Sequence, residues 1–120
     1  MITRTFDYDN LFAGNVQPVV TKEVTIAEGS GELVRGTVLG KNDATGLCTI
    51  VNSTKEDGSE RPYAILSDDV NATDEDVVST AYFSGEFNER KLIFGGTDDA
   101  DTHRRDMREM GLYMNPVVKA

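Results

Sequence analysis

The sequence predicts an α+β fold dominated by β-structure: a small mixed β fold of short strands with one C-terminal helix, preceded by a flexible N-terminal arm. Short segments rich in β-branched and aromatic residues alternate with clusters of Gly, Asn, Asp and Ser, which is typical of strands joined by turns. The apolar pattern takes a helical period once, after Gly95 and Gly96. A length of 120 residues fits one domain. We expect that domain over residues 16–120 and the arm over residues 1–15.

The arm carries large apolar side chains between polar residues, at a spacing that fits neither a regular helix nor a regular strand. These side chains are Phe6, Tyr8, Leu11 and Phe12. A terminal segment of this kind is mobile unless other contacts hold it. Two readings remain open: the arm packs on the protein's own body, or it becomes ordered on a partner.

The first strands follow from local patterns. In QPVVTKEVTI, period-two alternation places Val20, Lys22, Val24 and Ile26 on one face. GELVRGTVLG reads as a second extended segment, because its glycines are too closely spaced for a long helix. LCTIV is a short, wholly apolar segment, which is typical of a strand buried on both faces, and YAIL predicts another short strand. We expect STKEDGSERP and SDDVNATDED to be solvated loops.

The longest predicted strand is VVSTAYFSGEF, with the polar turn NERK after it. Alternation places Phe83 and Phe87 on one face with Gly85 between them, which is the pattern of a bent or bulged strand. Core packing accounts for the two phenylalanines. Tyr82 and Glu86 fall on the other face, and we predict that they are subunit-contact residues.

TDDADTHRRDMREMG predicts the single helix. Thr97 or Asp98 can cap its N-terminus, and Gly111 is the predicted residue after its C-terminus. Its narrow apolar face comprises Ala100, Met107 and Met110. LYMNPVV then predicts a short final strand.

Catalytic, metal and cofactor sites are not indicated, and we predict no catalytic residues, no metal ligands and no cofactor. His103 is the single histidine and, lying in a charged helix, is expected on the solvated surface. Cys48, the single cysteine, is expected to be a small core residue. SDDVNATDED fails the EF-hand pattern, since Asp74 occupies the glycine position and Thr80 the glutamate position.

Composition also bears on partners and location. The net charge of −9 argues against binding to nucleic acid. No apolar stretch approaches the ~20 residues that span a bilayer, so we expect no membrane partner. The N-terminus has no signal-peptide pattern, and we expect folding in the cytoplasm.

Three stretches together resemble the lambda-type head decoration protein family of tailed bacteriophages and prophages. They are LFAGNVQPVVTKEVTIAEGSGELVRGTVLG, YAILSDDVNATDEDVVSTAYFSGEFNERKLIF and the helix ending MGLYM. The resemblance runs in order from Leu11 to about Val118. Each motif alone is a generic β pattern, and their order and spacing give the match its specificity.

The resemblance implies a non-enzymatic homotrimer on the outer surface of the virion capsid, at the three-fold positions of the expanded head. Such a trimer stabilises the shell against internal DNA pressure, and its partner is the major capsid protein. The arm would order on that protein, with Ile2, Phe6, Tyr8, Leu11 and Phe12 as anchors. Assembly would take place in the host cytoplasm. We therefore expect deletion of residues 1–12 to leave a folded protein that no longer decorates shells.

Two other functions remain open. The β scaffold could be a binding module whose loops, such as STKEDGSERP, recognise a carbohydrate or host-surface ligand. Against this, sugar sites usually use exposed aromatic side chains, and these loops hold almost none apart from the flanking Tyr63. A small metal-dependent hydrolase would need carboxylates brought together in a cleft, which the sequence does not indicate.

Overall fold

The computed structural model describes Leu11 and residues 19–115, which form eight strands, one short 3-10 helix and one α-helix. The strands are β1 (Val20–Ile26), β2 (Gly31–Leu33), β3 (Val38–Lys41), β4 (Cys48–Ile50), β5 (Ala64–Leu66), β6 (Val70–Ala72), β7 (Val77–Asn88) and β8 (Leu112–Asn115). The helices are η1 (Glu89–Lys91) and α1 (Ala100–Glu109). The predicted α+β class, dominated by β-structure with one late helix, is confirmed.

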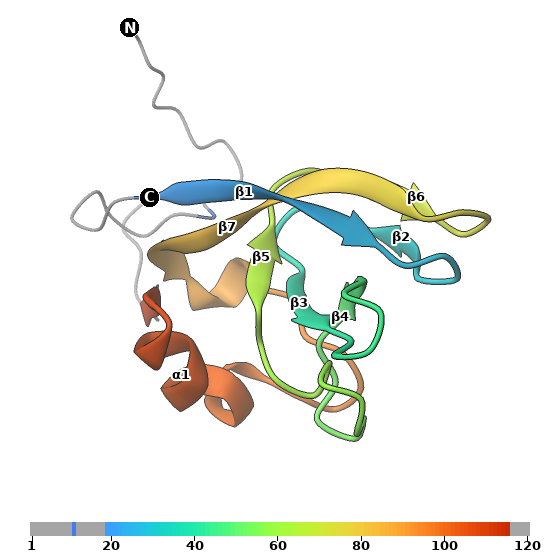
Figure 1. Cartoon of the computed structure of the whole chain (residues 1–120). Coiled ribbons are helices and arrows are strands. Elements are labelled where there is room, and N and C mark those ends of the chain that lie inside the picture. Colours follow the sequence, from blue (N-terminus) through green and yellow to red (C-terminus); the bar gives the residue numbers. More distant parts are fainter. Residues whose placement is uncertain (1–10, 12–18, 116–120) are drawn as a thin grey trace, which may run out of the picture.

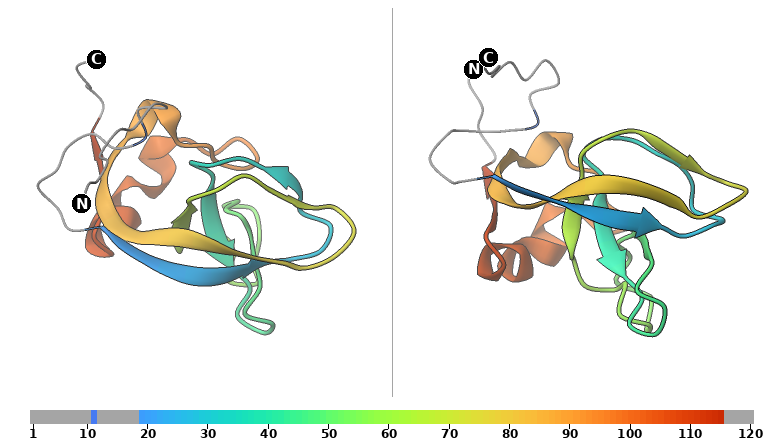
Figure 2. Two further views of the ribbon diagram at one scale, coloured as in Figure 1. Left: turned by 90° about the horizontal axis from the view of Figure 1, so that it is seen from above. Right: turned by 45° about the horizontal axis from the view of Figure 1, so that its top comes forward.

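Most of the strands pair in a closed ring. β1 pairs with β7, β7 with β5, β5 with β3 and β3 with β4, all antiparallel. β4 returns to β1 through a parallel pairing of Cys48 with Ile26. The strands therefore curl into a small barrel with α1 at one side (Figures 1 and 2). β8 extends the sheet by pairing in parallel with the end of β7.

Two apolar clusters stabilise this arrangement. The barrel core consists of Val24, Ile26, Leu33, Leu39, Cys48, Ala64, Leu66, Ala72 and Ala81. The outer core consists of Leu11, Val38, Val51, Ile65, Phe87, Leu92, Met107 and Leu112. β5 serves both, because successive side chains of a strand point to opposite faces: Ala64 and Leu66 enter the barrel core, and Ile65 enters the outer core. YAIL contains the predicted short strand. LCTIV, which was predicted to be buried on both faces, is buried only at Cys48 and Val51, whereas Thr49 and Ile50 are half-buried, so that prediction is only partly correct.

The segment GELVRGTVLG is two strands, which corrects the expectation of one extended segment. Gly36 lies between them at a φ of +99°, a conformation that favours glycine. A β-carbon there would lie 2.8 Å from the Lys91 carbonyl oxygen. The acidic stretch SDDVNATDED is likewise not all loop, because it contains β6, which pairs with β2 as a two-stranded ribbon.

β7 contains the predicted irregularity, but its two phenylalanines face different cores. The register with β1 shifts where Val20 pairs with Ser84 and Thr21 with Tyr82. An extra residue in one strand inverts the faces of all residues beyond it. Phe83 therefore packs against the barrel core, whereas Phe87 is fully buried in the outer core. The expectation that both share one face is wrong.

The N-cap of α1 differs from both predicted caps, because it lies one residue after Asp98 and two after Thr97. Asp99 is the N-cap, and its side chain accepts a hydrogen bond from the Thr102 backbone N–H while the Thr102 hydroxyl accepts one from the Asp99 N–H. Gly111 follows the C-terminus at a φ of +90°, as predicted. Met107 is fully buried, but Met110 is 40% exposed, so the predicted apolar face is only partly correct.

Candidate functional site

Leu11 is the point where the N-terminal segment meets the folded body. Its side chain is 1% exposed and lies in the outer core. Its carbonyl oxygen accepts a hydrogen bond from the Asn88 N–H, at the end of β7, with an N–O distance of 2.7 Å. At this residue the structure fits the reading in which the arm packs on the protein's own body. The other predicted anchors, Ile2, Phe6, Tyr8 and Phe12, lie outside the described residues.

The start of β1 is the second place where this segment adjoins the body. Val19 and Val20 are 46% and 42% exposed, whereas Val24 and Ile26 further along β1 are buried. The predicted alternation is therefore confirmed only in the second half of the strand. Because Val20 pairs with Ser84, this exposed apolar pair lies beside the irregular part of β7.

The two predicted subunit-contact residues both lie on β7. The Tyr82 hydroxyl accepts a hydrogen bond from the Arg35 guanidinium, and the Tyr82 ring packs on Phe87 with 5.8 Å between ring centroids. Glu86 is half-buried and lies in register with Tyr113 of β8. Tyr82 thus has contacts within its own chain. Contact of either residue with another subunit stays a prediction.

His103 is buried, and the expectation that it lies on the solvated surface is wrong. Its Nε2 atom lies 2.8 Å from the Asp98 Oδ2 atom, and both side chains are 3% exposed. Its ring stacks on Phe94 with 5.7 Å between centroids. Asp98 also accepts hydrogen bonds from the Ser53 N–H at 2.7 Å and from the Ser53 hydroxyl. The cluster ties the start of α1 to the loop after β4.

The pKa of the Asp98 carboxyl reflects two opposing effects. Burial raises this pKa, but the hydrogen bonds from Ser53 and His103 outweigh burial and lower it below its ordinary value. The ionised carboxylate is therefore the form that the cluster stabilises. Through these hydrogen bonds, Asp98 connects the loop after β4 to α1 and has a structural role.

Ser53, Asp98 and His103 are the residue types of a hydrolytic triad, but their order in space is different. In a triad the histidine accepts the proton of the serine, and the aspartate orients the histidine. Here Ser53 donates to Asp98, so the aspartate lies between the other two. This arrangement leaves the serine without a base to activate it. Cys48, the other conceivable nucleophile, is 1% exposed, and burial raises the pKa of its thiol to about 11.

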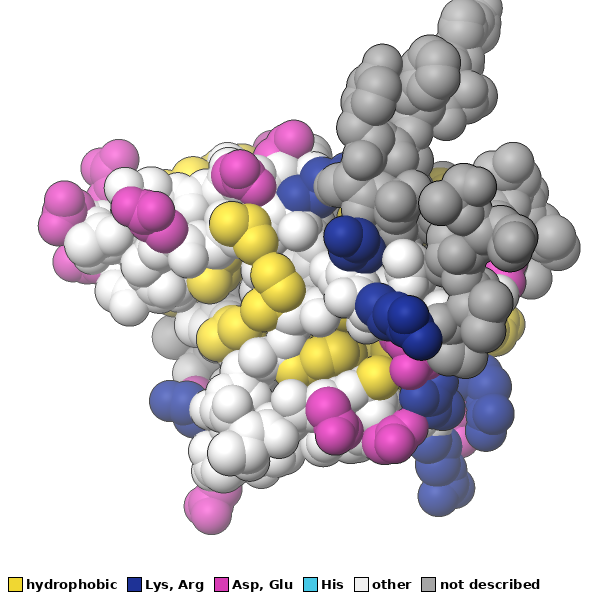
Figure 3. Space-filling view, turned by 180° about the vertical axis from the view of Figure 1, so that it is seen from behind, with side chains coloured by type: hydrophobic (Ala, Val, Ile, Leu, Met, Phe, Trp, Pro, Cys, Tyr) yellow, Lys and Arg dark blue, Asp and Glu magenta, His cyan; other side chains and the backbone are white. Residues whose placement is uncertain are grey.

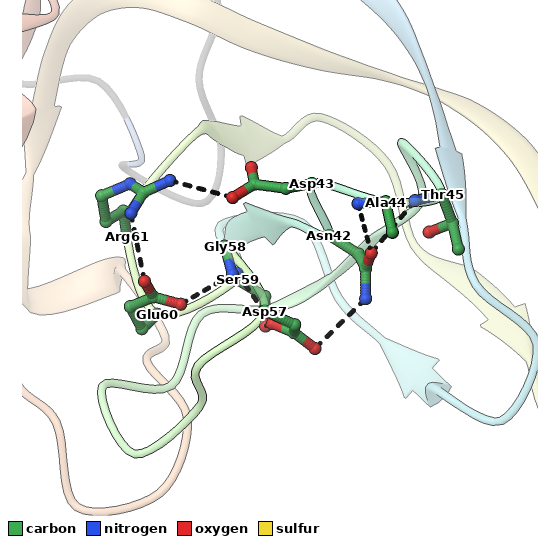
Figure 4. A network of polar contacts seen from close by, with 9 residues as sticks. All are labelled: Asn42, Asp43, Ala44, Thr45, Asp57, Gly58, Ser59, Glu60 and Arg61. Atoms are coloured by element: carbon green, nitrogen blue, oxygen red, sulfur yellow. Dashed lines mark hydrogen bonds and ion pairs between the residues drawn. The ribbon is translucent and has the colours of Figure 1, made fainter.

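The loop STKEDGSERP is more ordered than predicted. Asp57 accepts hydrogen bonds from the N–H and hydroxyl of Ser59 and from the Asn42 amide, and Arg61 pairs with Asp43 at 3.4 Å (Figure 4). Ser59 is 2% exposed, so the expectation of a wholly solvated loop is wrong. A β-carbon on Gly40 would lie 2.3 Å from the Ser59 carbonyl oxygen, which explains the glycine in β3.

A depression of about 280 Å³ lies beside this loop, and it bears on the carbohydrate alternative. Its lining is polar apart from Ile50 and includes no aromatic side chain: Glu28, Gly29, Ser30, Thr49, Ile50, Asn52, Lys55, Asp57 and Ser59. Stacking on an aromatic ring is the contact that a sugar site usually uses. The depression therefore does not favour a carbohydrate site.

Two carboxylates of the acidic stretch SDDVNATDED accept hydrogen bonds from backbone N–H groups of other segments. Asp69 accepts a hydrogen bond from the Arg35 N–H at 2.8 Å, and Asp76 accepts one from the Glu28 N–H at 2.7 Å. Among Leu11 and residues 19–115, no group of three or more His, Cys, Asp or Glu side chains could hold a metal ion. No helix in the same part of the chain has the length and apolar character that a membrane span requires.

A comparison with known families identifies the chain. The model described as bacteriophage lambda head decoration protein D matches residues 2–111, which include the first two stretches of the resemblance and the third as far as Gly111. No curated protein matches the sequence. The family is one of structural capsid proteins and not of enzymes. The chain therefore belongs to the bacteriophage lambda head decoration protein D family, and it is a structural protein that associates with the phage capsid.

Proposed function

We propose that this head decoration protein binds the outer surface of the expanded phage head as a homotrimer. It sits at the three-fold positions, contacts the major capsid protein, and stabilises the shell against internal DNA pressure. Assembly takes place in the host cytoplasm, and the protein binds neither nucleic acid nor membrane. Family membership supports the capsid as partner, and the net charge of −9 disfavours a nucleic-acid partner.

The observation that carries the binding mechanism is the burial of Leu11. Because this residue packs in the outer core and bonds to Asn88, it anchors the first residues of the chain to one place on the body. In this proposal Ile2, Phe6 and Tyr8, which precede that anchor in the sequence, contact the capsid. Phe12, on the other side of the anchor, is a further contact residue in this proposal.

The arm binds by adding an extended segment to the capsid protein. Main-chain hydrogen bonds to a sheet edge supply affinity, and alternate side chains fill pockets. Three arms on one trimer bind the same shell, so each bound arm raises the effective concentration of the others. Weak single contacts then give durable attachment.

Truncation of the arm tests this mechanism. The burial of Leu11 places the cut after residue 10, because the deletion of residues 1–12 would also remove a core side chain. We expect the chain without residues 1–10 to keep the thermal stability of the full chain and to lose co-sedimentation with expanded, undecorated capsids. The full-length chain, saturating at one trimer per three-fold site, is the positive control. Full capsid binding by the truncated chain would refute the arm mechanism.

A further inference from the structure

An exposed apolar surface lies where the turn after β2 meets the segment after η1. Val34 and Ile93 are 45% and 40% exposed. The Val34 carbonyl accepts hydrogen bonds from the Thr37 N–H at 3.1 Å and the Thr37 hydroxyl at 2.7 Å. The Ile93 N–H donates to the Gly36 carbonyl at 3.1 Å. These bonds fix the two apolar side chains on neighbouring, rigid pieces of backbone.

Two cationic residues shortly precede Ile93 in the chain. Arg90 and Lys91 are exposed, and the Lys91 carbonyl abuts Gly36 in the same turn. Within the part of the chain that the structure describes, no carboxylate lies within ion-pair distance of either side chain. On a chain with a net charge of −9, this is a local reversal of sign. We call Val34, Arg90, Lys91 and Ile93 the basic apolar patch.

At the patch end of the β2–β6 ribbon, Asp68 and Asp69 are also exposed, just before β6. A larger group of carboxylates lies at the other end. The loops that flank the ribbon there carry exposed carboxylates: Glu28, Asp74, Glu75 and Asp76. Hydrogen bonds from the Glu28 N–H to Asp76 at 2.7 Å and from the Gly29 N–H to the Ala72 carbonyl at 2.8 Å join the two loops. We call these four residues the acidic tip. The ribbon projects from the barrel on the side away from α1 (Figures 1 and 2).

Charge is unevenly distributed across one face of the molecule. Figure 3 shows a group of Asp and Glu side chains at one end of this face, hydrophobic side chains near its middle, and most of its Lys and Arg side chains on the opposite side, where Asp and Glu side chains also lie. The acidic tip and the basic apolar patch lie at opposite ends of the same ribbon. One molecule thus cannot bring its own tip onto its own patch, whereas two copies can.

We infer that the basic apolar patch binds the acidic tip of a second copy of this chain, head to tail. Val34 and Ile93 supply the apolar part of the contact, while Arg90 and Lys91 pair with Asp74 and Glu75 of the neighbour. A contact between two different surfaces forms a closed ring when the rotation that relates successive copies closes. The inference rests on the proposed homotrimer, in which the ring closes with three copies. It identifies the residues that join neighbouring copies.

Charge reversal of the full-length chain tests the contact. We expect the double variant Arg90→Glu, Lys91→Glu to associate at least about tenfold more weakly than the unaltered chain, because like charges then face each other. Adding Asp74→Lys and Glu75→Lys to the same chain should restore association. The quadruple variant has the net charge of the unaltered chain, so its recovery would reflect pairing and not overall charge. Arg105→Glu, Arg108→Glu on α1 is the matched control, with an equal change in charge.

Molar mass is measured by light scattering across a concentration series, and each variant is also tested for co-sedimentation with expanded capsids. The inference fails if the quadruple variant is not restored, if the control weakens association equally, or if the unaltered chain is monomeric at its highest soluble concentration. Any of these results, together with capsid binding by the unaltered chain, would overturn this contact alone. Restored association of the quadruple variant, together with failure of the unaltered chain to bind capsids, would overturn the proposed decoration function and leave the contact standing.

Discussion

Substitution of Leu11 by alanine should destabilise the isolated protein, although this residue lies in the segment that the sequence assigns to a mobile arm. The side chain is 1% exposed among outer-core residues from β3, β5, β7 and α1. Replacing a fully buried leucine with alanine removes apolar contact and leaves a cavity, which costs about 2–5 kcal/mol. We expect about 3 kcal/mol here. For a domain of this size, that loss lowers the midpoint of thermal unfolding by roughly 10 °C.

The assay is urea denaturation of the isolated chain, followed by circular dichroism, in the absence of capsids. Val78→Ala is the matched control, because Val78 is an apolar residue that is 60% exposed. Its free energy of unfolding should change by less than about 1 kcal/mol. If Leu11→Ala leaves stability unchanged, Leu11 does not pack on the body of the free protein. The fixed anchor point of the proposed arm would then be wrong.

Two further substitutions test the fold. Gly85→Ala should lower the free energy of unfolding by roughly 1–3 kcal/mol in the same assay, because φ at Gly85 is +145° and the new β-carbon would lie 3.1 Å from the Phe87 ring. Gly46→Ala is the comparison, because a β-carbon there would have no atom within 4 Å. A smaller loss of stability for Gly85→Ala than for Gly46→Ala would contradict the packing argument. Asp98 has a folded pKa below its ordinary value of 3.8, so its carboxylate stabilises the fold above that pH and the stabilisation disappears as pH falls through the folded pKa. Asp98→Asn should therefore lower stability at neutral pH and reduce the acid-dependent loss, and identical urea midpoints against pH in both proteins would disprove this.

Most elements of the fold were predictable because their signals are local. Alternation marks the buried half of β1, the apolar run of YAIL marks a short strand, and Gly111 marks the end of α1. Each signal depends on residues close together in the chain. The order and spacing of the same patterns were also sufficient to identify the family, and the match of the family model to residues 2–111 confirms that identification.

The wrong predictions concern features that depend on contacts between residues far apart in the sequence. Asp98 was a plausible helix cap by position, but its partner Ser53 lies 45 residues away, so no local pattern could reveal the buried cluster with His103. The faces of Phe83 and Phe87 depend on a register shift against β1, which only the pairing of two strands defines.

The sequence by itself determined the β-dominated class, the single helix, the absence of a recognisable catalytic motif and membership of the family. Only the tertiary structure decided which surfaces are available for contact. It buries Leu11 against the body, although the sequence pattern assigns this residue to an arm, and it leaves the apolar Ile93 40% exposed. The physical reason is that the burial of a side chain depends on how the helices and strands pack around it. The chemical character of the side chain determines only how strongly it favours burial.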